Sequence, residues 1–378
     1  MKVVLCTPYK GVNPNNPGGI AIWARNVKAF YNTHTEDVNL EICPIDREHD
    51  FENEFSFARI WYGVKEYWNN YKKVKIFVKD NNYDVMHICT SASMSLLKDL
   101  LFLNVASKYG IRSVVHFHFG RIPEIFGARN WEYKLICKVL KKATVVSVMS
   151  NSSYETLVKA GFKNVVYLPN PLSTTVCNAI EEASKTVSCS CRNEGEILFA
   201  GHVIPTKGVY ELVEACANVD KVKKLTLLGF VEDKKVQEDL IAKADAIRGH
   251  HDWIDFAGAV PHEQVIKEML RCSLFVLPTY TEGFPNVILE SMACACPIIT
   301  TPVGAIPEML DSKSGHPCGS LVKVRDAQEL QARIESYLKA PAEAITMGKY
   351  AKDRVYTVYS MDAVWKQLLE VWMKAYKS

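Results

Sequence analysis

Residues 277–290 read LPTYTEGFPNVILE, a stretch in which a buried strand turns into a helix. The apolar strand ends near Pro278, a short loop presents Glu282 and Gly283, and Pro285 suits the first turn of the helix that follows. Free N–H groups at the start of such a helix can bind phosphate, while a glutamate beside them can reach the hydroxyls of a polyol. Two glutamates eight residues apart are common by chance, so the signal is their setting between strand and helix.

Apolar runs of strand length alternate with helical patterns along the whole chain. Their Val, Ile, Leu and Phe side chains lie on both faces, which is typical of parallel strands covered by helices. This alternation predicts doubly wound α/β sheets, in which ligands bind beyond the carboxyl ends of the strands. We expect strands at residues 2–9, 84–89, 113–119, 144–150, 165–170, 196–202, 225–230, 254–260, 272–280, 297–303 and 320–324.

The alternation breaks once, at residues 172–195. That segment is polar, rich in Ser and Thr, and shows no strand signal, so we interpret it as the connection between two Rossmann-like domains. A chain of 378 residues suits two domains, at ~150 residues for each. Residues 361–376 carry apolar and aromatic side chains at helical spacing, which predicts a packed helix at the end of the chain.

The composition is that of a protein with a sizeable core, with 48% hydrophobic and 23% charged residues. Lys and Arg number 45 against 42 Asp and Glu, and this net charge of +3 argues against a dedicated nucleic-acid binder. The apolar start is cut short by Pro8, so we expect a first strand rather than a secretory signal, and no apolar run reaches the ~18 residues of a membrane span. The twelve cysteines, including the close pairs Cys189/Cys191 and Cys294/Cys296, lack metal-ligand spacing, so we expect no metal and a cytoplasmic location.

Three further strand ends carry residues that suit phosphate binding, proton transfer or hydrogen bonding. Gly18 and Gly19 precede a helical pattern and let backbone N–H groups approach an anion, although an ordinary surface turn has the same composition. His118 closes the strand in VVHFHFG, where it can act as base, donor or orienter, or be a half-buried histidine of the core. Lys207 lies in a loop that opens a helix, as a point charge for a diphosphate or as a solvated lysine.

Four motifs, taken together, resemble those of the family 4 retaining glycosyltransferases. Residues 281–310, TEGFPNVILESMACACPIITTPVGAIPEML, resemble the family's E-x7-E block, and 197–215, ILFAGHVIPTKGVYELVEA, its glycine and Lys-Gly segment. Residues 253–265, WIDFAGAVPHEQV, look like its F-x-G-x-V segment, and 17–21, PGGIA, like its Gly-Gly loop. The motifs occur in the family's order, densely in the C-terminal half and sparsely in the N-terminal half.

The resemblance implies a GT-B fold, which has two Rossmann-like domains facing across a cleft. Residues 1–171 would form the acceptor domain, 172–359 the donor domain, and the helix 360–378 would cross back to the first. The family's activity would be metal-independent, retaining transfer of a hexose from a nucleotide-diphosphate sugar, UDP more often than GDP. No cofactor is implied, and the acceptor would be a saccharide or a lipid-linked saccharide in surface polysaccharide biosynthesis.

The resemblance also implies roles for particular residues. Glu282, His118 and Lys207 match the positions around the transferred sugar and its diphosphate. The donor-binding positions match Gly18, Gly19, His202, Lys207, Gly283, Phe284, Asn286, Val287 and Glu290, the last facing the ribose. Three positions depart from the family pattern: His202 replaces the usual Arg, which weakens the positive charge beside the diphosphate, Ala295 replaces a glycine, and Phe119 follows the strand-end histidine.

Two basic and aromatic stretches stand out in the N-terminal half, at residues 61–79 and 131–142. Such helices suit an anionic membrane surface, which would bring the enzyme to the inner face of the membrane and to a lipid-linked acceptor. The alternative is a pair of amphipathic helices that pack Trp and Tyr into the core and leave their lysines solvated.

Two other functions remain open from the sequence. A nucleotide-sugar epimerase of the same fold would need acid and base groups on both sides of the sugar. A non-catalytic, glycosyltransferase-like binding subunit is favoured by His202 and opposed by Glu282, Glu290, Lys207 and His118.

Overall fold

The computed structural model describes residues 1–10, 18–34, 38–46, 57–187 and 192–378, and the side chains of residues 57–61 and 64 are outside this description. Pro17 of the glycine motif and the Cys189/Cys191 pair are therefore outside it too. The chain forms two compact units. Unit 1 comprises Met1–Pro171 and Met361–Ser378, and unit 2 comprises Leu172–Ser360.

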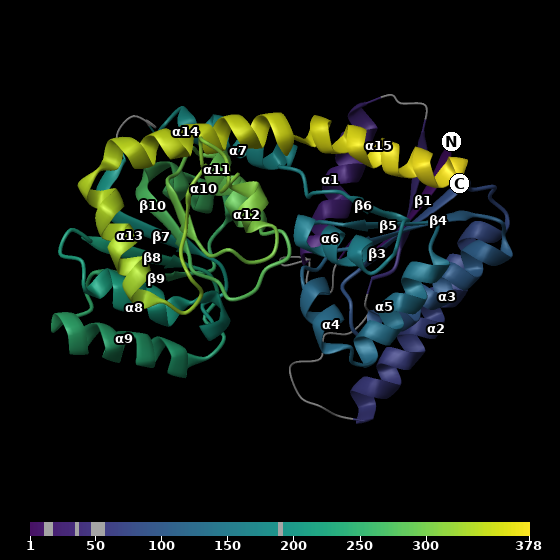
Figure 1. The fold of residues 1–378 in the computed structure, drawn as a ribbon, viewed down its shortest axis with the longest axis horizontal. Helices are drawn as coiled ribbons and strands as arrows, with labels where there is room; N and C mark the ends of the chain where they lie inside the picture. The colour runs from purple at the N-terminus through teal and green to yellow at the C-terminus, as the bar shows by residue number, and fades with distance from the viewer. Residues whose placement is uncertain (11–17, 35–37, 47–56, 188–191) are drawn as a thin grey trace. The chain divides into compact units, whose positions relative to one another are not determined.

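Unit 1 is built on a six-stranded parallel sheet in the order β2-β1-β3-β4-β5-β6 (Figure 1). Its strands are β1 (Lys2–Thr7), β2 (Asn39–Pro44), β3 (Val85–Thr90), β4 (Arg112–Phe117), β5 (Val145–Val148) and β6 (Val165–Tyr167). Its helices are α1 (Gly19–Thr33), α2 (Phe57–Lys79), α3 (Ser95–Lys108), α4 (Ile122–Ala128), α5 (Trp131–Lys142), α6 (Asn151–Lys159) and α15 (Met361–Lys377). Helices α1 and α15 cover one face of the sheet, and α2, α3 and α5 lie side by side over the other.

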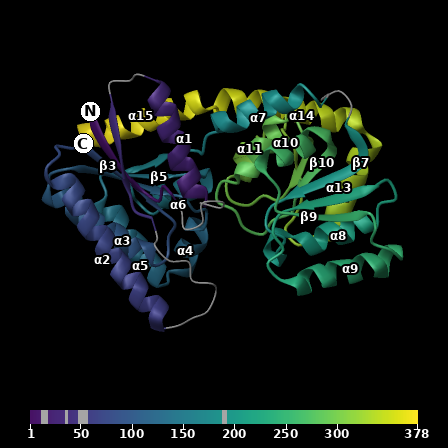
Figure 2. The same ribbon diagram turned by 180° about the vertical axis from the view of Figure 1, so that it is seen from behind.

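Unit 2 repeats the plan with a parallel sheet in the order β12-β11-β10-β7-β8-β9 (Figure 2). Its strands are β7 (Asn193–Ala200), β8 (Lys224–Leu228), β9 (Ile254–Gly258), β10 (Cys272–Leu277), β11 (Ile298–Thr300) and β12 (Ser320–Leu321). Its helices are α7 (Thr174–Ser184), the 3-10 turn η1 (Pro205–Lys207), α8 (Val209–Ala217), α9 (Lys234–Arg248), α10 (His262–Arg271), α11 (Asn286–Ala293), α12 (Ile306–Met309), α13 (Ala327–Lys339) and α14 (Pro341–Val358).

The last helix, α15, shows why the apolar spacing at the end of the chain produces a packed element. Val364, Trp365, Leu368 and Trp372 recur one turn apart, and each is nearly excluded from water against the unit 1 sheet. Burial of a side chain of this size stabilises the fold by about 1.5–3 kcal/mol. The segment therefore belongs to the core of unit 1, although unit 2 separates it from that unit in sequence.

Two expectations about the elements were wrong. Strand β2 was not expected, because NLEICP is short and half polar, as suits a strand at the edge of a sheet. The segment 172–195 is more than a connection: Val176, Ile180 and Ala183 line the buried face of α7, which packs on α10, and β7 already begins at Asn193. Its apolar residues are few, but they recur at helical spacing.

Candidate functional site

Two loops at the carboxyl ends of β7 and β10 are locked together by backbone contacts. The N–H of Tyr280 donates to the carbonyl of Thr206 at 2.9 Å. Gly208 has φ +73°, and a Cβ there would lie 2.0 Å from the carbonyl oxygen of Pro278, so only glycine permits this approach. The close approach fixes where Lys207 and Glu282 lie relative to each other.

Lys207 and Glu282 form the central ion pair of the site, with Nζ and Oε1 2.5 Å apart and both side chains largely buried. A second segment supports Glu282 from the other side. The N–H of Ala305 donates to the carbonyl of Gly283 at 3.0 Å, and a Cβ at Gly304 would lie 2.3 Å from the carbonyl oxygen of Glu282. Backbone contacts on two sides thus hold residues 282–283, called the glutamate turn from here on, and keep the Glu282 carboxylate in place.

Helix α11 begins directly after this turn. Pro285 is the N-cap residue of α11, whereas the sequence had suggested a position in the first turn. No described side chain caps the helix. Phe284 is buried against the ring of Tyr359, with ring centroids 5.6 Å apart. The first turn of α11, with Asn286 and Val287, therefore starts where the glutamate turn ends and brings the positive end of the helix dipole there.

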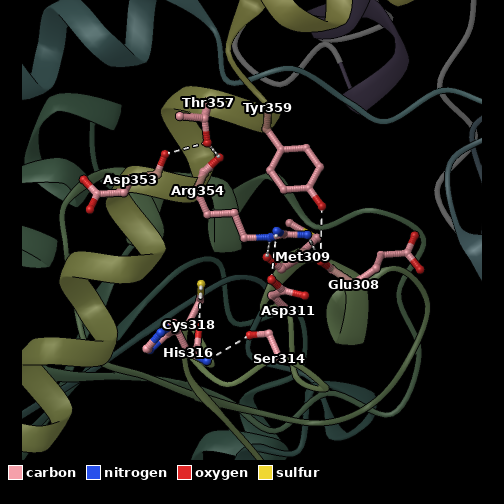
Figure 3. Close-up of polar contacts among 10 residues, drawn as sticks. All are labelled: Glu308, Met309, Asp311, Ser314, His316, Cys318, Asp353, Arg354, Thr357 and Tyr359. Atoms are coloured by element: carbon pink, nitrogen blue, oxygen red, sulfur yellow. Dashed lines mark hydrogen bonds and ion pairs between the residues drawn. The ribbon is translucent and has the colours of Figure 1, made fainter.

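Arg354 of α14 fixes residues 308–311, which follow Gly304 in the chain (Figure 3). Its guanidinium donates to the carbonyls of Met309 and Glu308 at 3.0 and 2.9 Å and pairs with Asp311 at 3.1 Å. The hydroxyl of Tyr359 also donates to the carbonyl of Glu308, at 3.3 Å. These contacts cap α12, the helix that follows Gly304. Sequence reasoning missed Arg354, because nothing in its local pattern connects it with residues so far away in the chain.

The second glutamate of the signature, Glu290, lies on α11 and is held by His262, the first residue of α10. Nε2 of His262 is 3.1 Å from Oε1 of Glu290, whose side chain is 15% exposed. This contact raises the pKa of His262, and the charge of Glu263 contributes to the same shift. His262 belongs to the segment that resembles F-x-G-x-V, but the sequence alone did not single it out.

His202 follows β7 and Gly201, as expected, but its Nδ1 is 2.8 Å from Oε1 of Glu232. Both side chains are about half exposed. A Cβ at Gly229 would lie 1.9 Å from the carbonyl oxygen of Gly201, so the ends of β7 and β8 are also in close contact. The residue that replaces the family's Arg therefore has an acidic partner, Glu232, that the sequence analysis did not identify.

In unit 1, Gly18 and Gly19 start α1 just after the undescribed residues 11–17. Gly18 has φ +82° and serves as N-cap, and among the described residues no side chain caps this helix. The first intrahelical bond runs from the N–H of Ile22 to the carbonyl of Gly18 at 3.1 Å. The earliest N–H groups of α1 resemble those of α11 in being uncapped by described side chains.

His118 directly follows β4, where its N–H donates to the carbonyl of Thr90 at 2.9 Å. The centroid of its ring lies 3.9 Å from that of His116 and 5.1 Å from that of Trp23. The two histidines thus share one face of the sheet, as strand alternation predicts. Burial lowers the pKa of His118 to about 3. Burial also lowers the pKa of His87 to about 3 and that of His116 well below its usual range. All three imidazoles are therefore neutral at pH 7.

Among the described residues, His87, Cys89 and His116 bring three possible metal-ligand atoms within 4.8 Å of one another. The donors do not fit a metal ion as they stand. The indole N–H of Trp372 donates to Nδ1 of His87 at 2.9 Å, and since an indole can only donate, the proton of His87 sits on Nε2 and blocks that nitrogen as a ligand. Burial also raises the pKa of the Cys89 thiol to about 12, which opposes a thiolate ligand.

The expected site residues thus fall into two groups. Those in unit 2 all follow the carboxyl ends of parallel strands or belong to α11, which brings them to one edge of the sheet. They are His202, Lys207, Glu282, Gly283, Phe284, Asn286, Val287 and Glu290. Those in unit 1 are Gly18 and Gly19, at the start of α1, and His118, directly after β4.

Residues 187–354 match the family model described as glycosyl transferases group 1. A teichuronic acid biosynthesis glycosyltransferase of Bacillus subtilis, itself putative by name, is 28% identical over 66% of this chain and 63% of its own length. A capsular polysaccharide biosynthesis glycosyltransferase of Staphylococcus aureus is 26% identical over 45% of this chain and 43% of its own. The matched segments thus cover less than two thirds of these relatives.

Solved structures of the same architecture cover the chain nearly from end to end. Sucrose-phosphate synthase from Thermosynechococcus elongatus has a TM-score of 0.75 at 18% identity and covers 100% of this chain and 99% of its own. HepE from Anabaena in complex with UDP has a TM-score of 0.69 at 16% identity, covering 98% and 99%. The expected GT-B fold is confirmed. Residues 187–354, which contain three of the four motifs, are similar to the glycosyl transferases of group 1.

Proposed function

We propose that this protein is a retaining, metal-independent hexosyltransferase that uses a nucleotide-diphosphate sugar, with UDP preferred to GDP. The observation that carries the proposal is the Lys207–Glu282 pair beside the first turn of α11. An ammonium group and helix N–H groups suit a diphosphate, and a carboxylate suits the hydroxyls of a sugar. Without a donor, the two side chains neutralise each other, and we expect the diphosphate to take over the ammonium when it enters.

In the proposed reaction, an acceptor hydroxyl attacks the anomeric carbon while the bond from that carbon to the diphosphate breaks. The hydroxyl proton leaves with the diphosphate, on which negative charge grows. Lys207 and the N–H groups at the start of α11 stabilise that charge because they are already in place before the reaction begins. Glu232 places a negative charge beside His202 that opposes a diphosphate, so we assign His202 a smaller share in donor binding.

We assign His118 a hydrogen-bonding role at the transferred sugar. With a pKa of about 3, it is a neutral imidazole at pH 7 and supplies no positive charge. A neutral imidazole still has one donor and one acceptor nitrogen. Gly18 and Gly19 would offer the N–H groups of α1 to the donor's phosphates, in the way proposed for α11.

The donor and acceptor classes that we propose are supported by the names and complexes of similar proteins. HepE has been solved with UDP and with UDP-glucose, which supports a UDP-sugar here. Relatives named for teichuronic acid, capsular polysaccharide and amylovoran biosynthesis support a saccharide or lipid-linked acceptor in surface polysaccharide assembly. We propose that the acceptor is used at the cytoplasmic face of the membrane.

Exposed aromatic side chains on α2 and α5 support peripheral contact with an anionic membrane. Trp68 and Trp131 are 52% and 51% exposed, contrary to the alternative in which the tryptophans of both helices pack into the core. Lys72 lies over the Trp68 ring at 5.6 Å, and further exposed lysines follow on α5. None of the helices that the structure describes combines the length and apolar character needed to cross a bilayer. The proposal is therefore contact with the surface, tested by sedimentation with anionic and neutral vesicles at low and high salt.

The central test is a donor assay. The purified protein is incubated with a panel of UDP- and GDP-sugars, with and without EDTA, and release of the nucleoside diphosphate is measured. We expect release from one UDP-sugar, undiminished by EDTA, and an added acceptor should yield a product with the donor's anomeric configuration. Tight nucleotide binding without release from any donor would favour a non-catalytic binding subunit. The replacement of the usual Arg by His202 is the feature that supports this second function.

A further inference from the structure

The contact between His262 and Glu290 joins the starts of two different strand-to-helix crossings. His262 opens α10 after β9, and Glu290 lies in the second turn of α11 after β10. The imidazole is 43% exposed, whereas the carboxylate is 15% exposed. Glu290 is thus a mostly buried acid, and its partner His262 is the more exposed member of the pair.

The geometry leaves part of the carboxylate available. A carboxylate offers two oxygens with about four acceptor positions, and His262 engages Oε1. The hydrogen bond restricts rotation of the Glu290 side chain and so fixes the direction in which the second oxygen points. A pair of neighbouring hydroxyls is recognised well only if the accepting oxygen is held in place, since ordering it on binding costs free energy.

We propose that His262 is a positioning residue that holds Glu290 for the 2′- and 3′-hydroxyls of the donor's ribose. The inference rests on the proposed function, because it takes the ligand to be a nucleoside diphosphate. Its new content is that discrimination between ribose and deoxyribose depends on α10 as well as on α11.

Another histidine–carboxylate pair in unit 2 shows what an incidental contact looks like. Nδ1 of His251 is 2.9 Å from Oδ1 of Asp245, a similar length, but both side chains are about half exposed. Exposed pairs of this kind contribute little to stability or orientation. His262 differs because its acidic partner is largely withdrawn from water, where a fixed hydrogen bond has more effect.

The test compares affinities for UDP and 2′-deoxy-UDP by titration calorimetry, repeated with GDP and 2′-deoxy-GDP. We expect the wild type to prefer the ribonucleotide by about tenfold, the size of one hydrogen bond to a charged group. His262→Leu should reduce that preference to about threefold or less, while His262→Gln, which can still donate, should retain most of it. His251→Leu is the matched control and should behave as the wild type.

Turnover provides a second readout. His262→Leu should raise the KM for the donor and leave kcat nearly unchanged, because ribose contacts are the same in the ground state and the transition state. If the wild type discriminates and both His262 variants discriminate equally well, the assignment of His262 is wrong and the proposed function stands. If the wild type binds neither ribonucleotide at millimolar concentration, the proposed function falls and takes this assignment with it.

Discussion

Unit 2 places pairs that contain a carboxylate at the ends of its strands, whereas unit 1 places neutral imidazoles within and directly after strands of the same parallel topology. Lys207–Glu282 and His262–Glu290 lie at the ends of β7, β9 and β10. Within β3 and directly after β4, burial keeps His87 and His118 uncharged. One architecture thus supports two electrostatic environments, and a nucleoside diphosphate, with its negative charge, suits the first.

The largest effect should follow from breaking the central pair of unit 2. Glu282→Ala and Lys207→Ala should each lower the rate of nucleoside diphosphate release by about 10²–10³, because each removes a fixed group from the proposed reacting centre. The Lys339–Glu335 pair on α13 has a similar separation of 2.6 Å but is exposed, and it provides the control.

Lys339→Ala should release nucleoside diphosphate at the wild-type rate. Melting curves should show all three variants folded, since the backbone contacts of Gly208 and Gly304 remain. The Glu282 and Lys207 variants should melt at a lower temperature than the Lys339 variant, because each leaves a largely buried charge without its partner. A Glu282→Ala protein with unchanged turnover would remove the carboxylate from the mechanism.

The second prediction concerns how unit 2 holds that pair. Gly208→Ala would bring a Cβ within 2.0 Å of the Pro278 carbonyl at a positive φ, so the two loops must separate. We expect a loss of about 3 kcal/mol in the free energy of unfolding and a large loss of turnover. Gly249→Ala is the control: its φ is +81°, but no described atom lies within 4 Å of the added Cβ, and we expect a loss of about 1 kcal/mol.

These examples show which parts of the site could be predicted from sequence. The sequence could propose Glu282, Lys207 and Glu290 because each belongs to a motif that follows a strand end, and parallel strands bring such ends to one edge of the sheet. The partners His262, Glu232 and Arg354 come from other crossings, and their contacts depend on packing that no local pattern encodes.

The same distinction applies to the fold. Continuous apolar runs predicted the central strands well, since both faces of those strands are buried. The edge strand β2 and the helix α7 were missed because each buries only a few residues. The basic helices were predicted as helices, but the exposure of Trp68 and Trp131 depends on where α3 lies between them.

The third prediction tests the neutral rings of unit 1. Trp372→Phe removes the donor to Nδ1 of His87 and leaves that nitrogen buried without its partner, which should cost about 2 kcal/mol of unfolding free energy. Trp365→Phe is the matched control on the same helix. Its indole N–H is buried and has no partner among the described residues, so its removal should cost clearly less. Equal losses from the two variants would show that the hydrogen bond to His87 contributes nothing.

The smallest effect concerns pH, and it has opposite signs in the two units. His118 has a folded pKa of about 3, below its ordinary value of 6.5, so the unfolded chain binds the proton first. Its contribution to stability is full above pH 6.5 and falls between 6.5 and 3. The pKa of His262 is raised by Glu290, so its contribution is full below 6.5 and is lost as pH rises through that higher pKa.

Urea unfolding of the wild type, His118→Gln and His262→Gln at several pH values separates these signs. Tryptophan fluorescence reports mainly on unit 1, because Trp253 is the one tryptophan of the sequence that falls in unit 2. Below pH 6.5, the free energy of unfolding of the wild type should fall by about 1 kcal/mol more per pH unit than that of His118→Gln. The reason is that His118 binds a proton in the unfolded wild type but not in the folded protein, and the variant has no such group. Circular dichroism, which follows both units, should show the stability advantage of the wild type over His262→Gln shrinking as pH rises. Parallel pH profiles for all three proteins would contradict the electrostatic contrast between the units.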